Sequence, residues 1–126
     1  MILNVIRGLP GSGKSTEGER LTPGRCFAAD DFFYMLGGGE YAFDPRRLGE
    51  AHAHCQSNVE AAMLDGHPVS VANTFTQAWE VSPYRALARR YGYEVKVIHM
   101  TGEWGSIHGV PEAAIARMRD RWEENV

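Results

Sequence analysis

Alternating strand-like and helix-like patterns predict an α/β fold, with a mainly parallel sheet of four to five strands between two layers of helices. Apolar and β-branched runs indicate strands at residues 2–7, 25–29, 68–73 and 93–100. Segments of helical period separate them, which favours parallel strands joined by crossover helices. The 126 residues suit a single domain, 1–126, built on one core.

Start and stop signals predict four helices, over residues 14–21, 44–64, 82–91 and from 111 onward. Gly18 lies inside the first and costs about 1 kcal/mol relative to alanine. Asp44-Pro45 provides a cap and a first-turn proline for the second, and Ser82-Pro83 does so for the third. The last helix is expected to carry Ile115, Met118 and Trp122 on one face.

Composition narrows the class of protein. No apolar run approaches the roughly 20 residues that cross a bilayer, and the N-terminus reads as a strand rather than a secretion signal. Cys26 and Cys55 are too few for a disulfide framework, so we expect a protein of the reducing cytoplasm. The lack of a long apolar run leads us to expect no membrane partner. A net charge of −3 means that any nucleic-acid binding must come from a local patch. The oligomeric state is left open.

A glycine-rich segment follows the first strand and opens the first helix. Its residues predict the nucleotide site: Gly8, Pro10, Gly11, Ser12, Gly13, Lys14, Ser15 and Thr16. This is a phosphate-binding loop, in which backbone amides surround a phosphate chain at a helix N-terminus. Lys14 would reach the β- and γ-phosphates of ATP, and the Ser15 hydroxyl would bind Mg²⁺. The fold class is therefore a P-loop NTPase, three-layer α/β/α.

Polar residues follow the second and third strands, where a parallel sheet forms its ligand crevice. Asp30 and Asp31 can accept a proton from an attacking hydroxyl, help to hold Mg²⁺, or cap the next helical turn. The third strand ends in Asn73-Thr74 and contains no carboxylate, so these side chains would bind a water, a phosphate or the acceptor hydroxyl.

Other polar side chains give weaker patterns. His52 and His54 point about 200° apart on a helix and cannot share one metal ion, so His52 is expected to be a core residue. Phosphoryl transfer is usually stabilised by guanidinium groups. Arg119, and Arg7 as a second choice, are the arginines expected to reach the site.

An ordered series of segments extends along the chain: Gly-Leu-Pro-Gly-Ser-Gly-Lys-Ser-Thr (8–16), Ala-Asp-Asp-Phe-Phe (29–33), Tyr-Ala-Phe-Asp-Pro (41–45), Ala-His-Ala-His-Cys (51–55), Asn-Thr-Phe-Thr-Gln-Ala-Trp-Glu (73–80), Pro-Tyr (83–84) and Ile-His-Gly-Val-Pro (107–111), with Met118 and Arg121. The series resembles the polynucleotide-kinase-like P-loop kinases, among AAA-type and zeta-toxin-like ATP-binding kinases. The resemblance implies ATP as donor, a hydroxyl acceptor that is often a nucleic-acid 5′-end, and Asp30 as general base.

Two departures from that family affect the acceptor side. Phe33 stands where phage-type polynucleotide kinases have an arginine that holds the nucleic acid. Residues 101–106, Thr-Gly-Glu-Trp-Gly-Ser, replace a lid that normally carries arginine, and they are too short for a lid helix.

Three functions follow from these residues. The first is a kinase in which Lys14 and Asp30 act on ATP and on a polynucleotide 5′-OH or nucleoside. The second is a nucleotide-binding regulatory protein with weak catalysis. The third is a small-molecule kinase in which apolar side chains, Phe33 among them, line the acceptor pocket. The set assigned to the acceptor or to second-sphere contacts is Asp31, Phe33, Asn73, Thr74 and Arg119.

Overall fold

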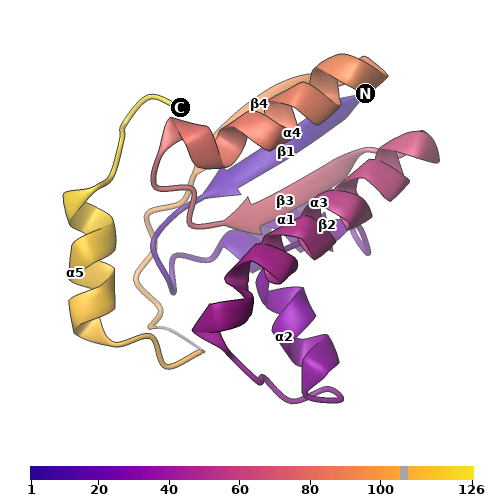
Figure 1. Ribbon diagram of the computed structural model, residues 1–126. Helices are drawn as coiled ribbons and strands as arrows, with labels where there is room; N and C mark the ends of the chain where they lie inside the picture. Colours follow the sequence, from indigo (N-terminus) through magenta and orange to yellow (C-terminus); the bar gives the residue numbers. More distant parts are fainter. Residues whose placement is uncertain (106–107) are drawn as a thin grey trace.

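The structure is a computed structural model that describes residues 1–105 and 108–126 (Figure 1). Its elements in chain order are β1 (Ile2–Arg7), α1 (Lys14–Leu21), β2 (Cys26–Phe27), α2 (Asp30–Leu36), the 3₁₀ turn η1 (Pro45–Arg47), α3 (Leu48–Leu64), β3 (Val69–Asn73), α4 (Ala78–Tyr91), β4 (Glu94–His99) and α5 (Glu112–Asp120). The described strands form one parallel sheet in the order β2-β3-β1-β4. The predicted α/β class is confirmed.

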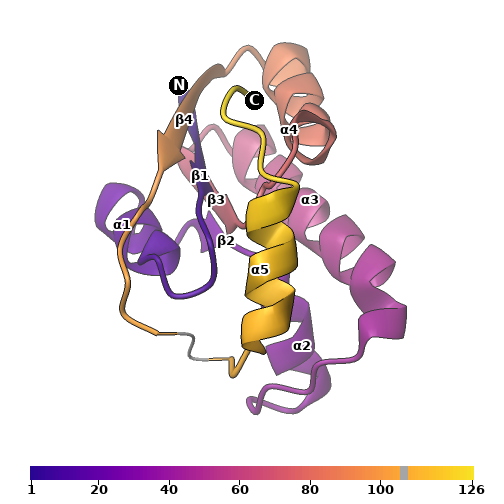
Figure 2. The same cartoon turned by 90° about the vertical axis from the view of Figure 1, so that its left-hand side faces the viewer.

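Helices cover both faces of the sheet, but unequally. Figure 2 shows α1 on one side of the strands and α3 with α4 on the other. The main core lies under α3 and α4, where alternate residues of β1 and β3 meet the apolar faces of both helices. Its buried members include Leu3, Val5, Val69 and Val71 from the strands. At the carboxyl ends of the strands, α2 and α5 stand away from the sheet (Figure 1).

Several element boundaries differ from the sequence prediction. Strand β2 ends at Phe27 rather than at residue 29, and α3 begins at Leu48, after the 3₁₀ turn η1. Helix α4 begins at Ala78 rather than at Ser82, because Gln77 and Glu80 form a reciprocal capping box at its start. Pro83 is therefore inside the helix, where it removes a backbone donor. The single turn expected after Asp30 extends to Leu36 as α2, and Trp122 lies beyond the end of α5.

Gly18 is required by close packing between α1 and β2. A Cβ atom at this position would overlap the Cys26 sulfur atom and lie 3.3 Å from Ile6 Cδ1. The unfavourable helix propensity of glycine is thus compensated by the close approach that it permits.

We expect Gly18→Ala to destabilise the protein. Overpacking costs about 1–3 kcal/mol, which exceeds the gain of about 1 kcal/mol in helix propensity. In a Cys26→Ala background the overlap with the sulfur atom is removed and only the approach to Cβ of residue 26, at 3.1 Å, and to Ile6 is left, so Gly18→Ala should destabilise the protein less. Urea unfolding of the four proteins measures this as a double-mutant cycle. The same stabilisation by Gly18→Ala in both backgrounds would contradict the packing account.

Arg7 has a structural role, so the expectation that it reaches the catalytic site is wrong. Its side chain is 1% exposed, and it donates to the carbonyl oxygens of Phe75 at 2.8 Å and Glu123 at 2.6 Å. The guanidinium also stacks on Trp122, 3.9 Å from the ring centroid. Burial lowers the pKa of Arg7, while the charge of Glu124 opposes that shift. Arg7 thus ties β1 to the segment after α5.

None of the helices formed by residues 1–105 and 108–126 combines the length and the apolar character needed to span a bilayer.

Candidate active site

A cavity of about 650 Å³ lies at the carboxyl ends of β1, β2 and β3. Its lining comes from the loop between β1 and α1, from the start of α2 and from the 41–52 segment. Residues 72–74 and residues within 104–105 and 108–118 complete it. This is the position that parallel α/β proteins use for ligands.

The glycine-rich loop has the backbone expected of a phosphate site. Gly11 and Gly13 adopt φ values of +82° and +92°, which side-chain-bearing residues rarely tolerate. Of the eight residues assigned to nucleotide binding, six line the cavity: Pro10, Gly11, Gly13, Lys14, Ser15 and Thr16. The other two residues of the loop, Gly8 and Ser12, are buried. A Cβ on Gly8 would approach the Met100 carbonyl oxygen to 2.7 Å, so Gly8 permits contact with the end of β4.

Lys14 lies between the loop and Asp30. Its Nζ donates to the Leu9 carbonyl oxygen at 3.0 Å. Burial lowers the pKa of the Lys14 ammonium group from 10.5 to about 8, and the nearby Asp30 carboxylate opposes the shift. The lysine is therefore held without a strong anionic partner, which a phosphate group would supply.

Nucleotide affinity is expected to fall by about tenfold for each pH unit above about 8, since neutral Lys14 must take up a proton to bind phosphate. Lys14→Arg should bind without this slope, because guanidinium stays charged throughout the range. Lys14→Met should bind weakly at every pH. Calorimetry with ATP–Mg²⁺ measures all three. Parent affinity that stays constant up to pH 10, or unchanged affinity in Lys14→Met, would contradict the assignment of Lys14.

The side chains of Asp31 and Asn73 hold the backbone just before the N-terminus of α2. The Ala28 amide donates to Asp31 Oδ2 at 2.9 Å, and the Ala29 amide donates to Asn73 Oδ1 at 2.9 Å. Burial raises the pKa of Asp31. Both side chains line the cavity, as does Thr74, but their polar atoms already anchor the backbone that carries Asp30.

Asp30 faces the cavity within a group of aromatic side chains. Tyr41 donates its hydroxyl hydrogen to Asp30 Oδ1 at 2.7 Å, and His108 Nδ1 lies 3.3 Å from Asp30 Oδ2. Burial first, and then the bond to Asp30, raise the pKa of Tyr41. Tyr34 and Phe43 extend this apolar wall.

Three sequence expectations do not match the position of the side chain. Phe33 is fully buried in a small cluster with Phe32 and Ala51 and does not line the cavity, because its side of α2 faces α3. Arg119 is exposed, pairs with Glu112 at 3.5 Å, and does not line the cavity. His52 is exposed on the cavity wall rather than buried in the core.

The segment after β4 is folded onto the glycine-rich loop. The Trp104 amide donates to the Gly11 carbonyl oxygen at 2.9 Å, and a Cβ on Gly13 would lie 2.8 Å from the indole ring. Trp104 is 75% exposed and lines the cavity. Ser106 and Ile107, included in the sequence segments above, lie outside the described residues. No arginine belongs to the described lining.

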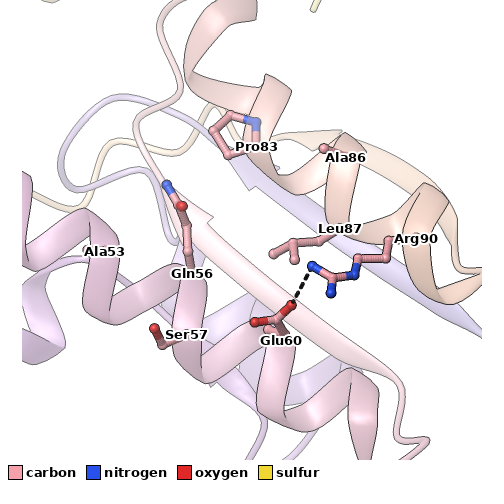
Figure 3. Close-up of a pocket in the computed structure, with 8 residues that line it drawn as sticks. All are labelled: Ala53, Gln56, Ser57, Glu60, Pro83, Ala86, Leu87 and Arg90. Atoms are coloured by element: carbon pink, nitrogen blue, oxygen red, sulfur yellow. Dashed lines mark ion pairs between the residues drawn. The ribbon is translucent and has the colours of Figure 1, made fainter.

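A second cavity, of about 420 Å³, lies between α3 and α4 and shares no lining residue with the first. Figure 3 shows Glu60 of α3 and Arg90 of α4 facing each other across it, 3.7 Å apart. Its other walls are small or aliphatic side chains with Gln56 and Ser57. The described part of the chain holds no cluster of three or more His, Cys, Asp or Glu side chains able to bind a metal ion.

Comparison with known proteins identifies the family. A family model described as "AAA domain" matches residues 3–108. The chain belongs to this family. It is also 36% identical, over 140 aligned positions, to human NEDD4-binding protein 2. The match covers all of this chain and 8% of that relative, so the chain corresponds to a small part of it.

Solved structures, two of them of kinases, share the fold. The Pnkp1/Rnl/Hen1 RNA repair complex matches with a TM-score of 0.68 at 17% identity, over 94% of this chain and 43% of the matched one. A gluconokinase from Sinorhizobium meliloti matches with a TM-score of 0.61 at 16% identity, over 98% of this chain and 75% of the matched one. Mycobacterium tuberculosis APS kinase, in complex with AMPPNP and APS, matches with a TM-score of 0.57 at 19% identity, over 92% of this chain and 66% of the matched one. The chain thus belongs to the AAA domain family and shares its fold with these kinases.

Sequence reasoning missed several residues that line the site. His108 and Tyr41 were noted only as members of family-like segments, although they contact Asp30 from 78 and 11 residues away. No local pattern predicts such contacts, because the chain between them sets the geometry. Trp104 carried a clearer signal, since it is an aromatic residue in the short glycine-flanked segment that stands where the resembling family has a lid.

Proposed function

We propose that this chain transfers the γ-phosphate of ATP to a hydroxyl acceptor, with a polynucleotide 5′-end or a nucleoside as the acceptor class. The observation that carries the proposal is the placement of Lys14 and Asp30 in one cavity, close enough for Asp30 to influence the pKa of the lysine. A phosphate-binding group and a candidate general base therefore face the same space.

The phosphate loop would hold the donor. Amides of the 11–15 segment and the Lys14 ammonium group would bind the phosphate chain. Ser15 would hold Mg²⁺, which fits because Ser15 is an exposed residue of the cavity lining and Mg²⁺ prefers oxygen ligands. When bound, the ion would neutralise charge on the phosphates.

Asp30 would act on the acceptor. Its carboxylate accepts the proton of the acceptor hydroxyl as that oxygen bonds to the γ-phosphorus, and the bond between this phosphorus and the bridging oxygen of ADP breaks. Tyr34, Tyr41 and Phe43 offer aromatic surface beside Asp30. Stacking on aromatic rings suits a nucleobase and tolerates any base, which favours a nucleoside or a nucleic-acid end over a simple sugar. The match to a chain of an RNA repair complex agrees with this class.

A second candidate is a nucleotide-binding regulatory domain with little catalytic activity. The observation that favours it is the lack of arginine among the described cavity residues, since guanidinium groups usually stabilise phosphoryl transfer. The small-molecule kinase stays a third outcome of the same test.

Transfer of label from γ-labelled ATP distinguishes the three. The acceptors are single-stranded DNA and RNA with a free 5′-OH, the same oligonucleotides with a 5′-phosphate, nucleosides, and sugars. We expect label on the 5′-OH oligonucleotides or nucleosides, none on the 5′-phosphorylated controls, and none with Lys14→Met. Transfer only to sugars would support the small-molecule kinase. ATP binding without any transfer would support the regulatory domain and contradict the proposal.

A further inference from the structure

The side chain of Asp30 is held by groups from two other parts of the chain. Tyr41 follows α2 and donates to Oδ1 at 2.7 Å, while His108 precedes α5 and places Nδ1 3.3 Å from Oδ2. The imidazole stacks on the Tyr41 ring with centroids 4.3 Å apart. Its Nε2 lies 3.1 Å from the Tyr34 hydroxyl. Each oxygen of the carboxylate thus has its own protein partner.

We propose that His108 and Tyr41 are positioning residues that aim the Asp30 carboxylate at the acceptor hydroxyl. This inference rests on the proposed function, because it assigns a purpose to a base that the proposed reaction requires.

The need for positioning follows from where Asp30 lies. It is the first residue of α2, and its side chain is 41% exposed, so packing alone does not fix its rotamer. A carboxylate has about four lone-pair sites, and the hydrogen bond from Tyr41 and the contact with His108 Nδ1 leave others free. With one partner on each oxygen, the carboxylate is held at the wall of the cavity that the acceptor would enter.

His108 is itself well held. Its side chain is only 19% exposed, and it lies between Tyr34 and Tyr41. When the Tyr34 hydroxyl donates to Nε2, the ring hydrogen is on Nδ1, the atom that faces Asp30. The imidazole of His108, which precedes α5, therefore contacts both α2 and Tyr41 next to the Asp30 carboxylate.

The chemical step is unchanged by these residues. Asp30 takes the hydroxyl proton, the new P–O bond forms, and ADP leaves with the electron pair of the broken bond. Tyr41 and His108 neither gain nor lose a proton. Their effect should therefore be on kcat, because it changes how often Asp30 faces the hydroxyl and leaves ATP binding alone.

The test compares three variants under saturating acceptor. His108→Phe keeps a stacking ring but removes the donor, and Tyr41→Phe removes only the hydroxyl group. His108→Asn loses the ring, but its amide nitrogen can take the place of Nδ1. We expect kcat to fall by about 10- to 100-fold in each phenylalanine variant, as for a lost bond to a charged group, with KM for ATP unchanged. His108→Asn should recover most of that loss. Thermal melting shows whether each variant is folded.

The outcomes separate this inference from the proposed function. If the parent protein is active and both folded phenylalanine variants have the same kcat as the parent, the inference is overturned and the proposed function stands. His108→Asn as slow as His108→Phe would overturn the role of the contact between Nδ1 and Asp30. If His108→Phe does not fold, Tyr41→Phe decides in the same way. A parent that transfers no phosphate overturns the proposed function and this inference together.

Discussion

Replacing Asp30 by asparagine is expected to lower phosphoryl transfer by about 10²- to 10⁴-fold, the usual contribution of a general base. ATP affinity should stay nearly unchanged, because a base acts in the transition state and the phosphate loop binds the donor. The amide oxygen of asparagine can still accept the Tyr41 hydroxyl bond, so α2 should keep its place. Single-turnover label transfer and calorimetry measure the two quantities.

Asp31→Asn is the matched control. Asp31 lies one residue away and accepts the Ala28 amide hydrogen, so its change alters local anchoring. We expect a smaller loss of transfer than for Asp30→Asn. Equal turnover of Asp30→Asn and the parent would remove Asp30 from the mechanism.

The isolated chain is expected to turn over slowly, below the range of about 1–100 s⁻¹ that is usual for kinases. A transition-state arginine is worth about 10³-fold or more in rate, and the described cavity lining contains none. Arg119→Ala should leave the rate unchanged, because Arg119 pairs with Glu112 away from the cavity. Steady-state rates with saturating ATP and acceptor measure both effects.

An arginine introduced on α5 tests the same point in the opposite direction. Ala114 lines the cavity, whereas Ala113 is exposed and does not. Ala114→Arg should raise turnover and the matched Ala113→Arg should not. A parent rate within the ordinary kinase range would contradict the account, and a rate that rises sharply on adding a second protein would indicate an arginine supplied in trans.

The sequence predicted those parts of the fold that depend on local patterns. The four strands, the ends of α1 and the left-handed glycines Gly66 and Gly92 follow from periodicity and cap residues. The glycine-rich loop between β1 and α1 follows from consecutive residues, and its binding of phosphate stays a prediction. The predicted start of α4 was wrong, because the sequence analysis relied on the proline signal at Ser82-Pro83 and the helix begins at the capping box formed by Gln77 and Glu80.

The acceptor side of the site depends on contacts that no local pattern contains. Phe33 and Tyr34 are neighbours, yet Phe33 is buried against α3 and Tyr34 faces the cavity. A difference of one residue on a helix rotates a side chain by about 100°, and only the packing of α2 decides which of the two faces inward. Arg7 was misjudged for a similar reason, since its carbonyl partners come from the distant C-terminal segment.

The most direct measurement is a crystal structure with a non-hydrolysable ATP analogue, Mg²⁺ and an oligonucleotide bearing a free 5′-OH. The account predicts that the phosphate chain lies on the amides of Gly11 to Ser15 with Lys14 at its outer phosphates. The 5′-hydroxyl should lie within hydrogen-bond distance of Asp30, between that carboxylate and the γ-phosphate. Phosphates bound elsewhere, or an acceptor hydroxyl that faces away from Asp30, would contradict it.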